Sequence, residues 1–97
     1  MQKLLAQTGL TVADIDWFEV NEAFAVVAMA AIQELDLPEA RVNPRGGAIA
    51  LGHPIGASGA RIVVSMLHGL QATGQQRGLA TLCIGGGEAT ALMIERL

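Results

Sequence analysis

Three side chains capable of chemistry stand where apolar or glycine-rich stretches end: Asn21, His53 and Cys83. Asn21 follows the strand-like run IDWFEV, His53 lies within the run GGAIALGHPIGASGAR, and a single isoleucine separates Cys83 from three consecutive glycines. All three side chains are reactive or form hydrogen bonds, and a neutral imidazole can donate one hydrogen bond and accept another. Sites in α/β sheets gather where strands end. The sequence therefore indicates one site built from three distant parts of the chain.

Each of these residues also has a plainer interpretation. An asparagine at a strand–helix junction is commonly the N-cap of the helix. A loop histidine that precedes proline, as in His53-Pro54, is often only solvated. A cysteine in an apolar strand is often a small buried hydrophobic residue. The residues taken singly leave these alternatives open.

The glycine-rich run argues against nucleotide binding. The segment Gly47 to Gly52 has the spacing G-x-x-x-x-G, but His53-Pro54 stands where a P-loop needs Lys followed by Ser or Thr. The dinucleotide fingerprint G-x-G-x-x-G is absent before the next helix. Glycine instead lets backbone approach other groups closely, and Pro54 stiffens the chain beside His53. These features are typical of a dry, tightly walled site in which a neutral histidine donates one hydrogen bond and accepts another.

Hydrophobic periodicity and glycine stops predict an α/β layer architecture, a sheet with covering helices. The predicted order is helix, strand, helix, weak strand, helix, strand, strand. The expected segments are 1–9, 15–20, 21–35, 41–43, 58–72, 78–84 and 88–96. The second and third helices are apolar on most of their surface, so both are expected to be buried. The short link between the last two strands predicts that they are antiparallel.

The amino-acid composition indicates which kinds of partner and which location the chain can have. The chain has 97 residues, which suits one domain, and only 15% are charged, against about 25% in an average soluble domain. We therefore expect a second domain or a partner to cover part of its surface. A net charge of −3 without charge runs argues against nucleic acid as a partner.

The longest apolar run, Ala23 to Ile32, is too short for a membrane span, and no signal-peptide pattern opens the chain. The single cysteine rules out an internal disulfide and suits a reducing compartment, so we expect a cytoplasmic location without membrane association.

Several sequence blocks together resemble the C-terminal part of thiolases, which are acetyl-CoA acyltransferases. Asn21-Glu22-Ala23-Phe24, Gly52-His53-Pro54 and Cys83-Ile84-Gly85 occur in that order. Between them lie Val42-Asn43, the run GGAIAL and the run GASGAR. The resemblance extends from about Gly9 to Leu97. One block alone would be weak, but their order makes the resemblance specific.

The resemblance implies an activity and four site residues. Thiolases join two acyl-CoA molecules by Claisen condensation or split a 3-oxoacyl-CoA, such as acetoacetyl-CoA, with free CoA. By position, Cys83 matches the acid/base cysteine and His53 the histidine that activates the nucleophile and helps to hold the thioester oxygen. Asn21 matches the residue that fixes a water in the same oxyanion hole, and Gly85 a backbone donor of a second one. The resemblance implies CoA thioesters as substrates, no separate cofactor and no metal. It also implies a homo-oligomer and a role such as fatty acid metabolism.

The chain also departs from the thiolase pattern. The family's nucleophilic cysteine lies in a Cys-x-Ser block of the N-terminal half, and this chain has no second cysteine. The chain also starts within the first helix of the family's C-terminal domain. We therefore expect residues 1–97 to be a partial thiolase C-terminal domain that lacks its first strand. That strand is expected in the middle of a five-stranded sheet whose last strand is antiparallel. Ala89 stands where a further glycine is expected.

The missing nucleophile leaves other functions open. In the first interpretation, an N-terminal thiolase half supplies the nucleophilic cysteine, and this chain alone is inactive. In the second, the chain is a non-catalytic remnant or interaction module that kept the fold. A module that only binds CoA is a third interpretation, without specific support in the sequence.

Overall fold

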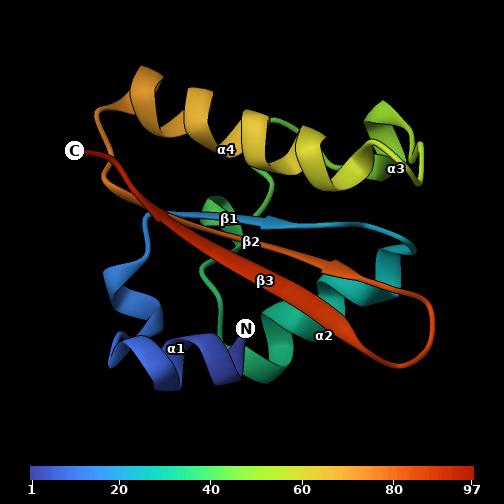
Figure 1. Ribbon diagram of the computed structural model, residues 1–97, viewed down its shortest axis with the longest axis horizontal. Helices are drawn as coiled ribbons and strands as arrows, with labels where there is room; N and C mark the ends of the chain where they lie inside the picture. Colours follow the sequence, from blue (N-terminus) through green and yellow to red (C-terminus); the bar gives the residue numbers. More distant parts are fainter.

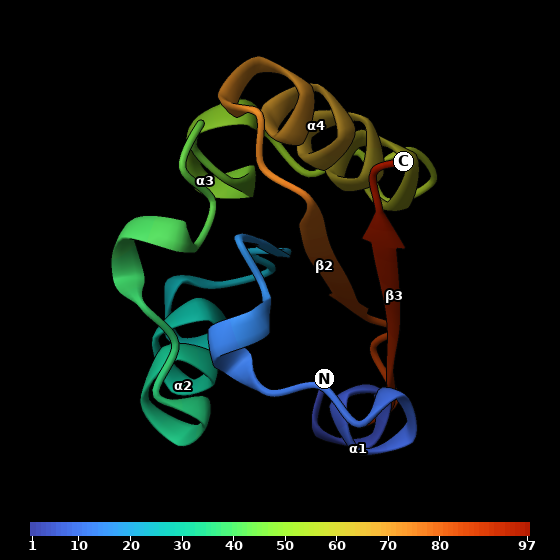
Figure 2. The same ribbon diagram turned by 90° about the vertical axis from the view of Figure 1, so that its left-hand side faces the viewer.

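The computed structural model describes all residues, 1–97, as three layers with a sheet in the middle. Helices α1 and α2 cover one face of the sheet, and α3 and α4 cover the other (Figures 1 and 2). This confirms the predicted α/β layer architecture. The elements are α1 (Gln2–Thr8), a 3-10 turn (Val12–Asp14), β1 (Trp17–Val20), α2 (Ala25–Leu35), a 3-10 turn (Glu39–Arg41), α3 (Ala48–Leu51), α4 (Ser58–Thr73), β2 (Arg77–Cys83) and β3 (Ala89–Glu95).

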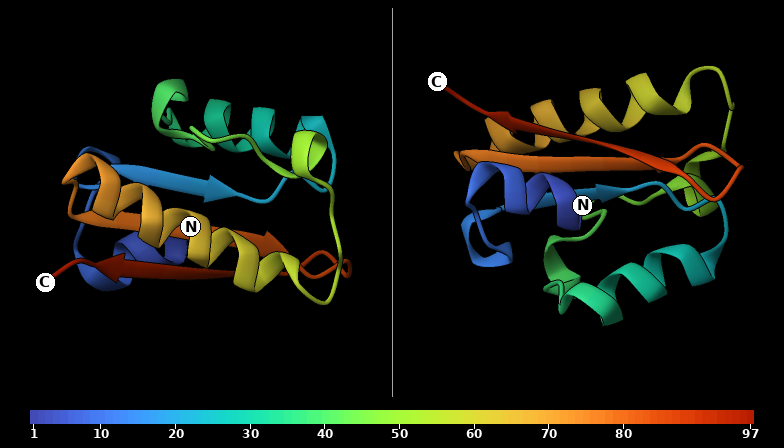
Figure 3. Two further views of the ribbon diagram at one scale, coloured as in Figure 1. Left: turned by 90° about the horizontal axis from the view of Figure 1, so that it is seen from above. Right: turned by 60° about the horizontal axis from the view of Figure 1, so that its bottom comes forward.

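The sheet has three strands in the order β1-β2-β3. β1 is parallel to β2, with Val20 opposite Thr81, and β3 is antiparallel to β2, with Cys83 opposite Ala89. The strand arrows show the same directions in Figure 3. The antiparallel final strand is thus confirmed. β2 is the middle strand and is paired directly on both sides, so no further strand lies between β1 and β2. The predicted strand at 41–43 is only a single bridge from Val42 to Phe18.

Side chains alternate along the strands and build one apolar core on each face of the sheet. Phe18, Val20 and Leu79 face the layer of α1 and α2, where they form a cluster with Leu5, Ile15, Ala28 and Leu37. Trp17 and Ala80 face α4, where they pack against Ile62, Met66 and Leu70. α4 lies very close to the sheet: a Cβ on Gly69 would come within 2.6 Å of the Trp17 ring. Glycine at this position therefore sets the distance between α4 and β1.

The two long helices differ in part from their predictions. α4 begins and ends close to the expected residues, and Gly74 stops it in the left-handed region at φ 69°. α2 starts at Ala25 rather than Asn21 and has Phe24 as its N-cap. Neither helix is enclosed: Phe24 is 73% exposed, Met29 66% and Val64 52%. The reason is geometric, because each helix packs on the sheet with one side only and nothing else in the chain covers the other side.

The first helix ends where the sequence predicts. α1 ends at Gly9, which takes φ 69°, as the sequence predicts. No helix of the chain is both long enough and apolar enough to cross a membrane.

Candidate active site

The carboxyl ends of the parallel strands β1 and β2 lie at the same edge of the sheet (Figure 3). Asn21 follows β1, and Cys83 is the last residue of β2. The glycine-rich segment that carries His53 joins α3 to α4 at this end of the sheet (Figure 1). The topology thus brings together three residues that are distant in sequence, at the place where such sheets collect their sites.

Asn21 is 2% exposed and does not cap α2, so its N-cap interpretation is wrong. Its backbone N–H continues the sheet by donating to the Thr81 carbonyl at 3.0 Å. Its side-chain Nδ2 lies 3.4 Å from Nε2 of His53. Its Oδ1 is buried and accepts no hydrogen bond from the protein. A buried acceptor without a donor costs about 1–3 kcal/mol, so this oxygen favours a small bound donor such as water.

The His53 ring is held on both of its nitrogens. Nδ1 lies 2.5 Å from Oγ of Ser58, and that hydroxyl donates to the Pro54 carbonyl at 3.1 Å. Because the hydroxyl has only one proton and uses it on Pro54, it accepts a hydrogen bond from Nδ1–H. The other nitrogen, Nε2, then carries the lone pair and faces Asn21. This neutral tautomer is suited to accept a proton at Nε2.

Ser58 was not predicted from the sequence. It is 1% exposed and is the first residue of α4, five residues after His53. Its position at the start of a predicted helix was visible in the sequence, but its contact with His53 depends on the fold of the intervening loop.

Cys83 is exposed, so its interpretation as a small buried hydrophobic residue is wrong. It lines a cavity of about 350 Å³ together with Asn21, Val20, Thr81 and Leu82 at the strand ends. Further lining residues come from α2 and the N-terminus, among them Val27, Ala31, Leu35 and Met1. The cavity is thus mostly apolar, and the Cys83 thiol and the Asn21 carboxamide are among the polar groups that line it.

The triple glycine forms the turn between β2 and β3. The N–H of Ile84 donates to the Glu88 carbonyl at 3.0 Å and closes the turn. Gly85 adopts φ 95°, a conformation that glycine takes readily. Its own N–H makes no hydrogen bond within the chain and is free to act as a donor two residues after Cys83.

Asn21 lies at the centre of the four predicted site residues. Asn21 touches His53, and Asn21 also shares a cavity with Cys83, which Gly85 follows at the turn. His53 and Cys83 make no hydrogen bond to each other, and Asn21 is linked to both, to His53 by a contact and to Cys83 by the shared cavity. Their catalytic roles stay predictions.

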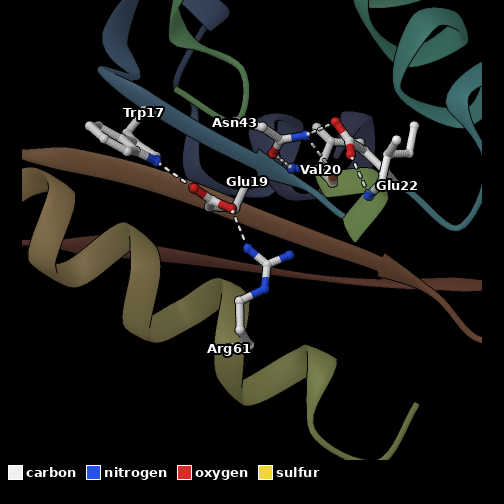
Figure 4. Close-up of polar contacts among 7 residues, drawn as sticks. Trp17, Glu19, Val20, Glu22, Asn43 and Arg61 are labelled. Carbon is white, nitrogen blue, oxygen red and sulfur yellow. Dashed lines mark hydrogen bonds and ion pairs between the residues drawn. The ribbon is translucent and has the colours of Figure 1, made fainter. Parts of the chain in front are cut away.

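A polar network fixes the backbone on either side of Asn21 (Figure 4). The Asn43 side chain accepts from the Val20 N–H at 2.9 Å and donates to the Val20 carbonyl at 2.8 Å, as a neighbouring strand would. It also donates to Oε1 of Glu22 at 3.2 Å, and Oε2 of Glu22 accepts from the Ile49 N–H at 3.0 Å. The network ties the end of β1 to α3 and leaves Asn21 little freedom.

A buried ion pair lies on the other side of β1, against α4 (Figure 4). Glu19 is fully buried, and its carboxylate accepts from Nε1 of Trp17 at 2.8 Å and from Nη1 of Arg61 at 3.3 Å. Burial raises the pKa of Glu19 above its usual value, against the lowering effect of the Trp17 and Arg61 donors. Neither Glu19 nor Arg61 stands out in the sequence as a site residue.

No three His, Cys, Asp or Glu side chains lie together in a way that could hold a metal ion. The expectation that the reaction needs no separate cofactor stays a prediction.

Comparison with known proteins decides the family. The model of the thiolase C-terminal domain matches residues 1–96. The chain belongs to the thiolase family, as a C-terminal domain. An acetyl-CoA acetyltransferase of Escherichia coli (strain K12) is 58% identical over 96 residues, which cover 99% of this chain and 24% of that protein. A beta-ketoadipyl-CoA thiolase of Pseudomonas knackmussii is 54% identical, over 100% of this chain and 25% of that protein. A cytosolic acetyl-CoA acetyltransferase of Mus musculus is 51% identical, over 99% and 24%.

These comparisons confirm the predicted resemblance and extend it to the first residue of the chain. The thiolase domain spans only about a quarter of the length of the curated relatives that it matches.

Proposed function

We propose that this thiolase domain supplies the acid/base and oxyanion-hole part of an acyltransferase that moves acetyl units between CoA thioesters. The reaction is 3-oxoacyl-CoA synthesis, as of acetoacetyl-CoA, or the reverse thiolysis. One observation carries the proposal: Asn21 contacts His53, keeps a buried oxygen without a protein donor, and shares a cavity with the Cys83 thiol.

The geometry supports separate roles for Cys83, Asn21 and His53. The Cys83 thiolate would take a proton from the α-carbon of the acyl group, and the thioester oxygen would then carry the negative charge. A water held by Asn21 would donate to that oxygen together with Nε2 of His53, once this nitrogen carries a proton. His53 would gain that proton from the nucleophile, since its Nε2 holds a lone pair in the tautomer that Ser58 imposes. Aimed donors of this kind are worth about 3–4 kcal/mol each in the transition state.

The backbone N–H of Gly85 would serve a second oxyanion. It is unused within the chain and lies in an exposed turn next to the thiol. The nucleophilic cysteine would come from a thiolase N-terminal half, because Cys83 is the only cysteine here. That half would also cover the exposed apolar residues of α2 and α4 in a homo-oligomeric, cytoplasmic enzyme, and fatty acid metabolism is one role for its products.

Thiolysis by the full-length protein that carries this domain tests the proposal. With acetoacetyl-CoA and CoA it should form acetyl-CoA, and Cys83→Ala should abolish this activity while CoA still binds. A protein that neither cleaves acetoacetyl-CoA nor exchanges the α-protons of acetyl-CoA with solvent would support the non-catalytic remnant instead. Saturable CoA binding without turnover would support a CoA-binding module.

A further inference from the structure

Two polar links run side by side between β1 and α4. One is the chain of contacts from Asn21 through His53 to Ser58, and the other is the Glu19–Arg61 ion pair. Glu19 and Asn21 are two residues apart, so they project to the same side of the strand, roughly 7 Å from each other. Ser58 and Arg61 are three residues apart on α4, about one helical turn. The ion pair is therefore the neighbour of the candidate catalytic contact.

The other contacts between α4 and the sheet are of a different kind. They are mainly apolar and join Ile62, Met66 and Leu70 to Trp17 and Ala80. Close packing of Gly69 against the Trp17 ring sets how near α4 lies to the sheet, but apolar attraction itself has no preferred direction. Charge-assisted hydrogen bonds require a particular distance and angle. Glu19 is also held from its own strand, because Trp17 binds its second oxygen at 2.8 Å.

Stability alone gives little reason for this pair. Removing two charges from water costs about as much as their attraction returns, so a buried ion pair is often no more stable than apolar residues of the same volume. Glu19 is fully buried, and the Arg61 side chain is only 23% exposed. What the pair can supply is a fixed position of the start of α4 relative to the end of β1.

We propose that Glu19 and Arg61 are positioning residues for the acyl transfer, which set the placement of His53 against Asn21. This inference rests on the proposed function. The 3.4 Å contact between the two site residues is long for a hydrogen bond, so small movements of α4 would break it. The ion pair prevents such movements because it joins the same two elements one turn away.

Steady-state thiolysis of acetoacetyl-CoA by the full-length protein tests this role. Glu19→Gln keeps the shape and the Trp17 partner but removes the charge, and Arg61→Met removes the other partner. Each variant should lower kcat about 10- to 100-fold, as expected for a catalytic group displaced by up to about 1 Å. KM for CoA should change less than about twofold, because Glu19 is fully buried and the Arg61 side chain is only 23% exposed. The double variant should lose no more than either single variant, since the two residues act as one unit.

Matched controls separate positioning from a general loss of structure. Arg61→Lys keeps the positive charge and should recover part of kcat. The exposed pair Arg77–Glu95, at 2.8 Å, joins β2 to β3 far from the site, and Arg77→Met/Glu95→Gln should retain kcat near that of the wild type. Melting temperatures show which variants are folded, and if Arg61→Met does not fold, Glu19→Gln and Arg61→Lys carry the comparison.

The proposal is wrong if Glu19→Gln and Arg61→Met lower kcat no more than the Arg77/Glu95 control does. It is also wrong if kcat falls in proportion to a rise in KM, or if the losses of the single variants add in the double variant. These results leave the proposed function intact, because the wild type is active in each of them. A wild type that does not cleave acetoacetyl-CoA overturns both proposals.

Discussion

Replacing Ser58 with alanine tests the tautomer of His53. The hydroxyl accepts the Nδ1–H of His53 at 2.5 Å and thereby leaves the lone pair on Nε2, next to Asn21. Without the hydroxyl, no protein group holds the proton on Nδ1. The ring can then exchange tautomers and rotate, so that a smaller fraction of the protein has the reactive nitrogen free and correctly placed.

The size of the effect follows from the surroundings of the ring. One neutral hydrogen bond is worth about 0.5–1.5 kcal/mol net, and a tenfold change in rate corresponds to about 1.4 kcal/mol, so kcat should fall about 2- to 13-fold. A buried histidine that lost its partner would lose far more, as in serine proteases, where the wrong tautomer costs about 10⁴-fold. His53 is exposed, so water can replace part of the lost contact.

The assay is the rate of acetoacetyl-CoA cleavage at saturating CoA in the full-length protein. Ser65→Ala is the matched control, because Ser65 lies on the same helix and takes no part in the hydrogen bonds of the His53 ring. A Ser58→Ala variant with the kcat of Ser65→Ala would show that the hydroxyl does not hold the ring. A loss above about 1,000-fold would also contradict the reasoning, since one solvent-replaceable hydrogen bond is too weak to produce it.

Three further predictions concern the site and the stability of the fold. His53→Ala should cut kcat far more than it weakens CoA binding, and equal losses in turnover and in binding measured by calorimetry would argue against a transition-state role. Gly47→Ala should lower the free energy of unfolding by about 1–3 kcal/mol, because the added Cβ would come within 2.3 Å of the Glu22 carboxylate. Urea titration measures this change, and an unchanged unfolding midpoint would show that the Glu22 side chain moves away freely. The backbone N–H groups of Arg77 and, to a smaller extent, Gln76 bind the Asp16 carboxylate and lower its pKa in the folded protein. The stability that this carboxylate contributes is therefore complete above its unfolded pKa of about 3.8, and it is lost as the pH falls through the folded pKa. The gap in melting temperature between wild type and Asp16→Asn should therefore narrow below about pH 4, and a constant gap would rule out this carboxylate as the cause.

Local sequence signals account for much of the fold. Gly9 and Gly74 end their helices because glycine enters the left-handed region without steric cost. The apolar run 78–84 predicted an interior strand, and β2 is the middle strand of the sheet. The short triple-glycine link predicted an antiparallel partner for it. These features depend on neighbouring residues only, so the sequence displays them directly.

The start of α2 shows where local signals fail. Asn21 is a good N-cap by residue type, but its N–H is taken by Thr81, sixty residues away, and the helix starts only at Ala25. The exposure of Phe24 and Met29 was also not predicted, because periodicity shows which residues are apolar and not whether anything covers them.

The sequence by itself determined the residue types of the site, their order and the family to which they belong. Only the tertiary structure decided that Asn21 touches His53, that Ser58 sets the tautomer of the ring, and that Glu19 pairs with Arg61. The physical reason is that these contacts join elements up to 42 residues apart, through side-chain directions that the sheet register and the rotation of α4 establish.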